Sequence, residues 1–213
     1  MASVESQSSS KQHKRKRIID ASIEVFAEKG FRGARISDIA RKAEVADGTI
    51  YLYFRNKEDV LLCIFEEKME EILAVLHGRL DGIEDPLERL RAFAATHFQL
   101  LRDHPALAQV FQVELRQSHR FLREYRPEKL WQYLQVIEEI VREGQETGAL
   151  RADLDPFLVK WAIFGALDEL SIQWVLARKR ERFNLDRAAG QVVEVFVGGM
   201  ANRSNTRNPR RKP

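Results

Sequence analysis

The sequence predicts an all-α protein of about nine helices, and three observations carry this prediction. Apolar residues recur at spacings of three and four positions in almost every segment between residues 15 and 200. Prolines 86, 105, 127 and 156 each stand where a helix tolerates proline, in its first turn. No run alternates between apolar and polar residues as a half-buried strand would. A hydrophobic content of 44% with 31% charged residues indicates a soluble protein with a substantial core.

The first helix is expected from Arg15, where Ile18, Val25 and Phe26 form an apolar stripe. Gly30 stands where a left-handed C-cap residue belongs, with Phe31 as the hydrophobic contact of a Schellman motif. Two short helices follow over 37–43 and 47–53, and a longer one begins near Lys57.

Five further helices are expected over about 86–102, from 105, over 127–148, over 156–179 and over 186–200. Both ends of the chain lack apolar periodicity, so residues 1–13 and 201–213 are expected to be disordered.

The charge is divided along the chain. Residues 1–60 hold 12 Lys and Arg against 9 Asp and Glu, whereas residues 61–200 hold 18 against 23. Nucleic-acid binding, if present, therefore belongs to the N-terminal part. The alternative is that the basic ends are merely solvated. The arm at 11–17 could follow the minor groove or raise the association rate through attraction to phosphates.

Several function classes lack support in the sequence. A single cysteine rules out a disulfide framework and a multi-cysteine metal site. The five histidines have no ligand spacing, and no phosphate-binding, dinucleotide-binding, nucleophile-elbow or zinc-protease motif occurs. We therefore expect no catalytic residues, no metal site and no enzyme. No signal peptide or membrane-spanning run is found, which favours the cytoplasm.

The helices at 37–43 and 47–53, joined by about three residues, have the spacing of a helix-turn-helix. The second helix would enter the major groove by its N-terminal end, where Gly48 and Thr49 permit close approach. Ile50 and Phe54 would anchor it to the core of the head. Phosphate contacts are expected from Tyr51, Tyr53 and Lys57.

The run AEKGFRGARISDIARKAEVADGTIYLYFRNKEDVL, residues 27–61, closely resembles the head of the TetR family of bacterial repressors. The resemblance implies a homodimer that binds a palindromic double-stranded DNA operator. It also implies a three-helix DNA-binding head at 14–60 and a helical ligand-binding and dimerisation body at 61–200.

Three residues depart from the family pattern. Arg35 replaces a capping threonine, so Ser37 or solvent would satisfy that helix start. Glu44 replaces a turn glycine, where a positive φ is expected. Ala46 replaces a capping serine, so Asp47 would cap the next helix. Arg35 could instead contact DNA. The candidate DNA-binding residues are Arg35, Ser37, Asp47, Gly48, Thr49, Tyr51, Tyr53 and Lys57.

Two segments of the body have a composition that suggests a ligand-binding site. Residues 112–126 carry a cationic cluster that could hold an anionic group or be a solvated helix face. Residues 157–180 are apolar on nearly every side, which is typical of a helix that packs against more than one partner. Asp168 and Glu169 fit this burial poorly. With the last helix, this segment would form a dimer interface and line a cavity, or it would simply pack in the core.

The same segments resemble the FadR (YsiA) group of TetR regulators, through Glu114–Ser118 and through Phe164, Gly165, Asp168, Glu169 and Trp174. The resemblance implies repression of fatty-acid degradation genes, with release from DNA by long-chain acyl-CoA. The candidate ligand-binding residues are Phe93, Phe98, Phe111, Arg116, His119, Arg120, Arg123, Trp131, Trp161, Phe164 and Asp168.

Three alternatives stay open at this point. A TetR-type repressor of an efflux or metabolic operon could sense another lipophilic molecule, with Asp168 and Glu169 as its support. A structural or interaction protein could have lost DNA binding through Glu44 and Ala46. An enzyme with a helical fold is the third, without a reactive constellation to support it.

Overall fold

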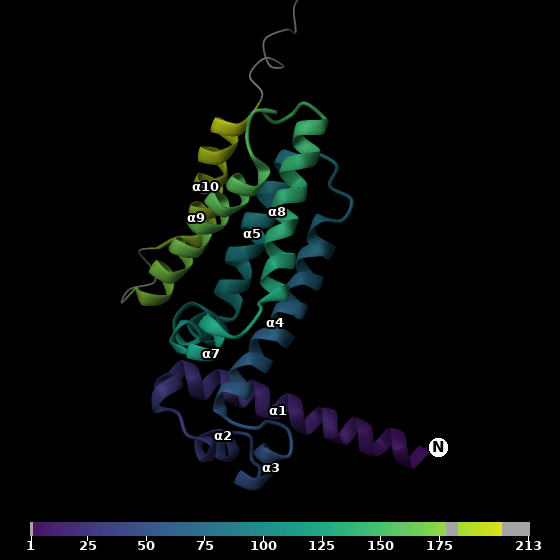
Figure 1. Cartoon of the computed structure of the whole chain (residues 1–213), viewed down its shortest axis with the longest axis vertical. Coiled ribbons are helices and arrows are strands. Elements are labelled where there is room, and N and C mark those ends of the chain that lie inside the picture. The colour runs from purple at the N-terminus through teal and green to yellow at the C-terminus, as the bar shows by residue number, and fades with distance from the viewer. Residues whose placement is uncertain (1, 178–182, 202–213) are drawn as a thin grey trace, which may run out of the picture. The chain divides into compact units, whose positions relative to one another are not determined.

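The structure, a computed structural model, describes residues 2–177 and 183–201 of the chain. In these residues it contains ten α-helices and no β-strand, which confirms the all-α prediction (Figure 1). Leu150 and Ala201 form one isolated antiparallel bridge. The chain divides into two compact units, which are Met1–Met69 with His104–Arg126, and Glu70–Asp103 with Pro127–Pro213.

The first unit contains α1 (Ala2–Gly33), α2 (Ile36–Lys42), α3 (Asp47–Tyr51) and the beginning of α4 (Lys57–Leu80). It also contains four short elements later in the chain: α6 (Pro105–Gln109), the π-helical η1 (Val110–Glu114), the 3₁₀ turn η2 (Leu115–Gln117) and α7 (His119–Arg123). Fully buried apolar side chains from α1, α2, α3 and α4 fill its core, among them Phe26, Ile39, Ile50 and Ile64.

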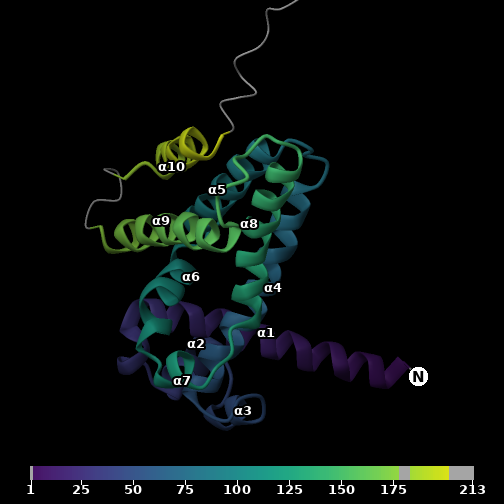
Figure 2. The same cartoon turned by 45° about the horizontal axis from the view of Figure 1, so that its top comes forward.

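The second unit contains the rest of α4, α5 (Pro86–Asp103), α8 (Glu128–Glu146), α9 (Pro156–Leu176) and α10 (Leu185–Met200). Within it, α9 packs against α8, and α10 packs against α5 and α9 (Figure 2). Phe93, Leu134, Ile137 and Leu167 are buried in its core.

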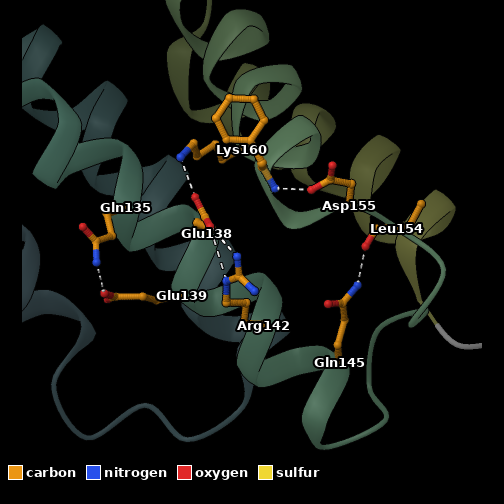
Figure 3. A network of polar contacts seen from close by, with 9 residues as sticks. Gln135, Glu138, Glu139, Arg142, Gln145, Leu154, Asp155 and Lys160 are labelled. Carbon is orange, nitrogen blue, oxygen red and sulfur yellow. Dashed lines mark hydrogen bonds and ion pairs between the residues drawn. The ribbon is translucent and has the colours of Figure 1, made fainter.

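A polar cluster ties α8 to α9 (Figure 3). The Glu138 carboxylate accepts hydrogen bonds from Lys160 of α9 and, at 2.7 Å, from Arg142 of α8. These two cations, Lys160 first, lower the pKa of Glu138. At the end of α8, the Gln145 amide donates to the carbonyl oxygen of Leu154 at 2.7 Å.

The structure corrects several sequence-based expectations. Because α1 begins at Ala2, residues 2–13 are helical where disorder is predicted. Of the predicted tail at 201–213, Ala201 forms the bridge with Leu150, and residues 202–213 lie outside the described residues. The domain boundary after residue 60 stays a prediction; it lies within α4, and the compact units divide between Met69 and Glu70.

The single helix expected after Pro105 is also wrong, because α6, η1, η2 and α7 divide this segment. At Gly30, φ is 74° as the sequence predicts, but ψ is 154°, so the residue is not the left-handed cap of a Schellman motif. Phe31 nevertheless packs edge-on against Phe26, with ring centroids 5.5 Å apart.

Candidate nucleic-acid interface and effector site

The turn between α2 and α3 has the backbone of a helix-turn-helix. Glu44 has φ 53°, and it is the sole non-glycine residue of the described ranges with a positive φ. The positive φ expected at this position is thus confirmed. Arg17 of α1 donates to the carbonyl oxygen of Ala43 at 2.6 Å and pairs with Glu44 at 3.2 Å, so α1 braces the turn.

The side of α3 that bears small residues is open. Asp47 and Gly48 are exposed and Thr49 is half-buried. A Cβ placed on Gly48 would meet no atom within 4 Å. Ile50 and Phe54 are buried, as the sequence predicts, while 58% of Tyr51 is exposed. The helix therefore presents its N-terminal end and Tyr51 outward.

The caps of α2 and α3 differ from the expected ones. Asp38, rather than Ser37 or solvent, accepts the Arg35 backbone N–H at 3.2 Å. Hydrogen bonds from Lys29 and then from the Arg35 backbone lower the pKa of Asp38. Arg35 and Ser37 are exposed beside it. At α3, the N-cap is Ala46 without a side-chain hydrogen bond, so the cap expected from Asp47 does not form.

The Lys57 ammonium forms hydrogen bonds within the protein. Its ammonium donates to the carbonyl oxygens of Ala34 at 2.9 Å and Arg32 at 3.2 Å, and it lies 4.8 Å from the centre of the Phe31 ring. Burial lowers the pKa of this ammonium. Tyr53 is half-buried next to Phe54. Lys57 therefore fixes the turn between α1 and α2, which the sequence did not indicate.

The cationic candidates lie along η2 and α7 in the first unit. Arg116 donates to Gln112 at 3.2 Å, and Arg120 lies 3.9 Å from Asp59 of α4. His119 and Arg123 are exposed. Close by, an aromatic cluster surrounds Phe65 of α4, with ring centroids 5.3, 5.2 and 6.0 Å away. Its members are Phe111, Phe121 and Tyr125.

The candidates of the second unit differ in burial. Phe93 and Phe98 are fully buried. Trp131 and Trp161 expose 50% and 43% of their surface. Phe164 is half-buried, and its ring centroid lies 6.3 Å from that of Trp161. The structure thus brings Trp161 and Phe164 together.

The two carboxylates of α9, which a site for a cationic lipophilic molecule would need to bury, are not deeply buried. Glu169 is exposed and accepts a hydrogen bond from Gln173, and Asp168 is only partly buried. Their support for a site that binds a cationic lipophilic molecule is correspondingly weaker.

A buried polar cluster was missed at the level of sequence. His97 of α5 lies between the Tyr133 hydroxyl at 2.7 Å and the Ser171 hydroxyl at 2.9 Å. Ser171 donates to the Leu167 carbonyl oxygen. Burial lowers the pKa of His97 to about 4, although the negative charge of Asp168 acts to raise it. The position of His97 on the apolar stripe of α5, four residues after Phe93, was the available signal.

An open groove of about 650 Å³ lies between α9 and α10. Ala166 and Leu170 of α9 and Val192, Val195 and Phe196 of α10 contribute its apolar walls. Of these residues, Val195 is 73% exposed.

No helix of the described residues has both the length and the hydropathy needed to cross a bilayer. In the same residues, no three His, Cys, Asp or Glu side chains are grouped so that they could hold a metal ion.

The fold and the head define a bacterial transcription regulator, and this chain belongs to the TetR family. Residues 18–64 match the bacterial regulatory proteins of the tetR family, and residues 65–199 match the C-terminal region of YsiA-like proteins. The resemblance seen in the sequence is confirmed for both parts of the chain.

Among similar proteins is the fatty acid metabolism regulator protein of Bacillus subtilis (strain 168). It is 39% identical over 193 residues, which cover 91% of this chain and 98% of that protein. The crystal structure of FadR from Bacillus subtilis in complex with stearoyl-CoA has a TM-score of 0.80 and 39% identity, covering 86% of this chain and 98% of that one. FadR from Bacillus halodurans has a TM-score of 0.81 and 41% identity, with coverages of 87% and 95%.

Proposed function

We propose that the protein is a homodimeric repressor of fatty-acid degradation genes that long-chain acyl-CoA releases from a palindromic operator. The observation that carries the proposal is the similarity to FadR, at 39% identity over 86% of this chain, in a structure that contains stearoyl-CoA. Its place of action is the cytoplasm, and it has no catalytic role.

The head supports the DNA-binding half of the proposal. A recognition helix must approach base edges closely, and the exposed Asp47 and Gly48 leave the N-terminal end of α3 unobstructed. Tyr51, Arg35 and Ser37 are exposed on the same helix-turn-helix and carry hydrogen-bond donors for phosphates.

The chemistry of the ligand supports the effector half. Each buried methylene of an acyl chain contributes about 0.8 kcal/mol, so a long chain supplies on the order of 10 kcal/mol. The phosphates of CoA require cations, and Arg116, Arg120 and Arg123 lie within eight residues of one another on η2 and α7. A switch from mostly bound to mostly released operator needs about 5.5 kcal/mol of differential affinity, which lies within that range.

The groove between α9 and α10 supports the dimer. Its apolar side chains, Val195 among them, would be covered by the same two helices of a second copy. Two heads held in this way would contact half-sites about 34–36 Å apart, or at a multiple of that spacing.

The test is a titration of the protein bound to a genomic fragment that it selects. Stearoyl-CoA is expected to release the fragment, whereas free CoA and acetyl-CoA leave it bound, because they lack a long acyl chain. Release is followed by fluorescence anisotropy of the labelled DNA. If acyl-CoAs of every chain length leave the complex intact, the proposed effector is wrong.

A further inference from the structure

Glu114 is a buried carboxylate that the proposed function does not yet use. It ends the π-helical turn η1, and only 4% of its surface is exposed. Single π-helical turns are rare and occur frequently at functional sites. Burial of a carboxylate is costly unless hydrogen bonds replace its water.

The strongest of its hydrogen bonds reaches the end of α1. The Phe31 backbone N–H donates to Glu114 Oε2 at 2.7 Å, across 83 positions of sequence. The side-chain amides of Gln117 and Gln109 donate to the same carboxylate at 3.1 and 3.3 Å. A backbone N–H that donates to a carboxylate forms a hydrogen bond about twice as strong as a neutral pair.

The backbone at Gly30 makes this contact possible. With φ 74° and ψ 154°, Gly30 turns the chain out of the helix, so the next N–H has no partner within α1. A Cβ on Gly30 would also lie 3.5 Å from Glu114 Oε2. The carboxylate therefore satisfies a donor that the break in α1 leaves open.

The held turn leads directly into the helix-turn-helix. Four residues after Phe31, Arg35 is the N-cap of α2. On the other side of the turn, Lys57 of α4 donates to the carbonyl oxygens of Arg32 and Ala34. The turn is thus fixed by one charge from η1 and by another from α4.

The segment that contains Glu114 touches the head at two further places. Ser118 donates to Glu58 at 3.3 Å, and Arg120 lies 3.9 Å from Asp59, so both contacts reach the first turn of α4. Arg116 and Arg120, candidate ligands of the CoA phosphates, follow Glu114 by two and six residues. A change in this segment would therefore reach both sides of the α1–α2 turn.

We propose that Glu114 is a positioning residue for DNA binding, which holds the α1–α2 turn and transmits the state of residues 104–126 to the head. Glu114 itself touches neither DNA nor effector. The transmission of an effector signal rests on the proposed function, whereas the positioning of the turn does not.

The experiment compares Glu114→Ala and Glu114→Gln with Glu124→Ala, which removes an exposed carboxylate from the same segment. Glu114→Ala is expected to weaken operator binding at least tenfold, and Glu114→Gln less, because its amide oxygen still accepts from Phe31. The slope of log K against log salt stays unchanged, since no phosphate contact is lost. Glu124→Ala binds as the wild type does.

Hydrogen–deuterium exchange measures the contact itself. Peptides that cover Phe31 are expected to exchange at least tenfold faster in Glu114→Ala and at the wild-type rate in Glu124→Ala. Operator binding or exchange at the wild-type level in both Glu114 variants would overturn the proposal.

Stearoyl-CoA separates positioning from plain destabilisation. The affinity of the Glu114→Gln variant for stearoyl-CoA, measured without DNA, is expected to stay within twofold of wild type. The increase in the operator dissociation constant that stearoyl-CoA causes is expected to be at least fivefold smaller in this variant. An unchanged effect of stearoyl-CoA on operator binding would overturn the proposed transmission through Glu114. If wild type itself does not respond, the proposed effector is wrong, and operator binding and exchange still decide the positioning role.

Discussion

At the scale of single residues, Glu44 occupies a backbone conformation that favours glycine. Its φ of 53° in the turn before α3 costs a non-glycine residue roughly 1–2 kcal/mol. The ion pair with Arg17 is exposed and contributes little in return. The residue thus introduces strain into a turn that must aim the recognition helix.

We expect Glu44→Gly to raise the free energy of unfolding by about 0.5–1 kcal/mol. Relief of strain exceeds the added entropy of the unfolded chain, which costs about 0.4–1 kcal/mol. Urea denaturation followed by circular dichroism measures the change. Gly82→Ala is the converse control. Gly82 has φ 75° and no atom lies near its Cβ position, so this substitution should lower the free energy of unfolding by about 1 kcal/mol. A loss of stability in Glu44→Gly would contradict the strain.

Residues whose role is local could be predicted from the sequence. The positive φ at Gly30 and the burial of Ile50 and Phe54 follow from backbone sterics and helical spacing. The positive φ at Glu44 follows from the family resemblance, which places a glycine at this position. The bonds of Lys57 and Glu114 could not be predicted, because their partners are backbone groups 23 and 83 positions away. Sequence spacing carries no information about such pairs.

At the scale of elements, prolines and glycines located the long helices. Pro86 and Pro156 begin α5 and α9, as predicted, because a helix start needs no proline N–H. One helix was predicted from Pro105 through Leu115, since the apolar spacing there is helical. The packing of Phe111 and Phe121 on Phe65 and the bond of Glu114 to Phe31 favour a broken path instead.

The three helices α5, α8 and α9 meet at His97, Tyr133 and Ser171. His97 is neutral there because burial disfavours its charged form. Since Ser171 donates to the Leu167 carbonyl oxygen, it accepts from one ring nitrogen, and the other ring nitrogen then accepts from the Tyr133 hydroxyl. Protonation of the ring would remove the acceptor for Tyr133. Protonation would therefore disrupt this arrangement and bury a charge among the three helices.

Stability is accordingly expected to fall as the pH falls from about 6.5 to 4. The pKa of His97 is about 4 in the folded protein and 6.5 in the unfolded chain, so the unfolded chain binds the extra proton in this window. The loss amounts to roughly 3 kcal/mol and levels off below pH 4. Urea titrations at several pH values measure it.

His97→Gln should lower stability at pH 7 and flatten this part of the pH profile, because the titrating group is gone. His77→Gln is the control, since His77 is exposed on α4. An equal pH dependence in wild type and His97→Gln would contradict the neutral buried ring.

At the scale of the whole molecule, the sequence indicates the family and the group within it through two separate regions. The head pattern at 27–61 identifies the TetR family, and the body segments around Glu114 and Asp168 point to the FadR group. The sequence could not show how the cations are paired or which aromatic residues are buried. These features depend on the packing of segments far apart in the chain.

The proposed association through α9 and α10 provides the last prediction. Val195 is 73% exposed on the groove between these helices, so Val195→Asp should leave the folded chain intact but place a charge in an apolar interface. We expect light scattering to show monomers in place of dimers. Operator affinity should fall roughly 100-fold or more, because two heads would no longer bind as one unit. Val75→Asp changes a 42% exposed valine of α4 and should remain dimeric. Dimers of Val195→Asp that bind DNA normally would place the interface elsewhere.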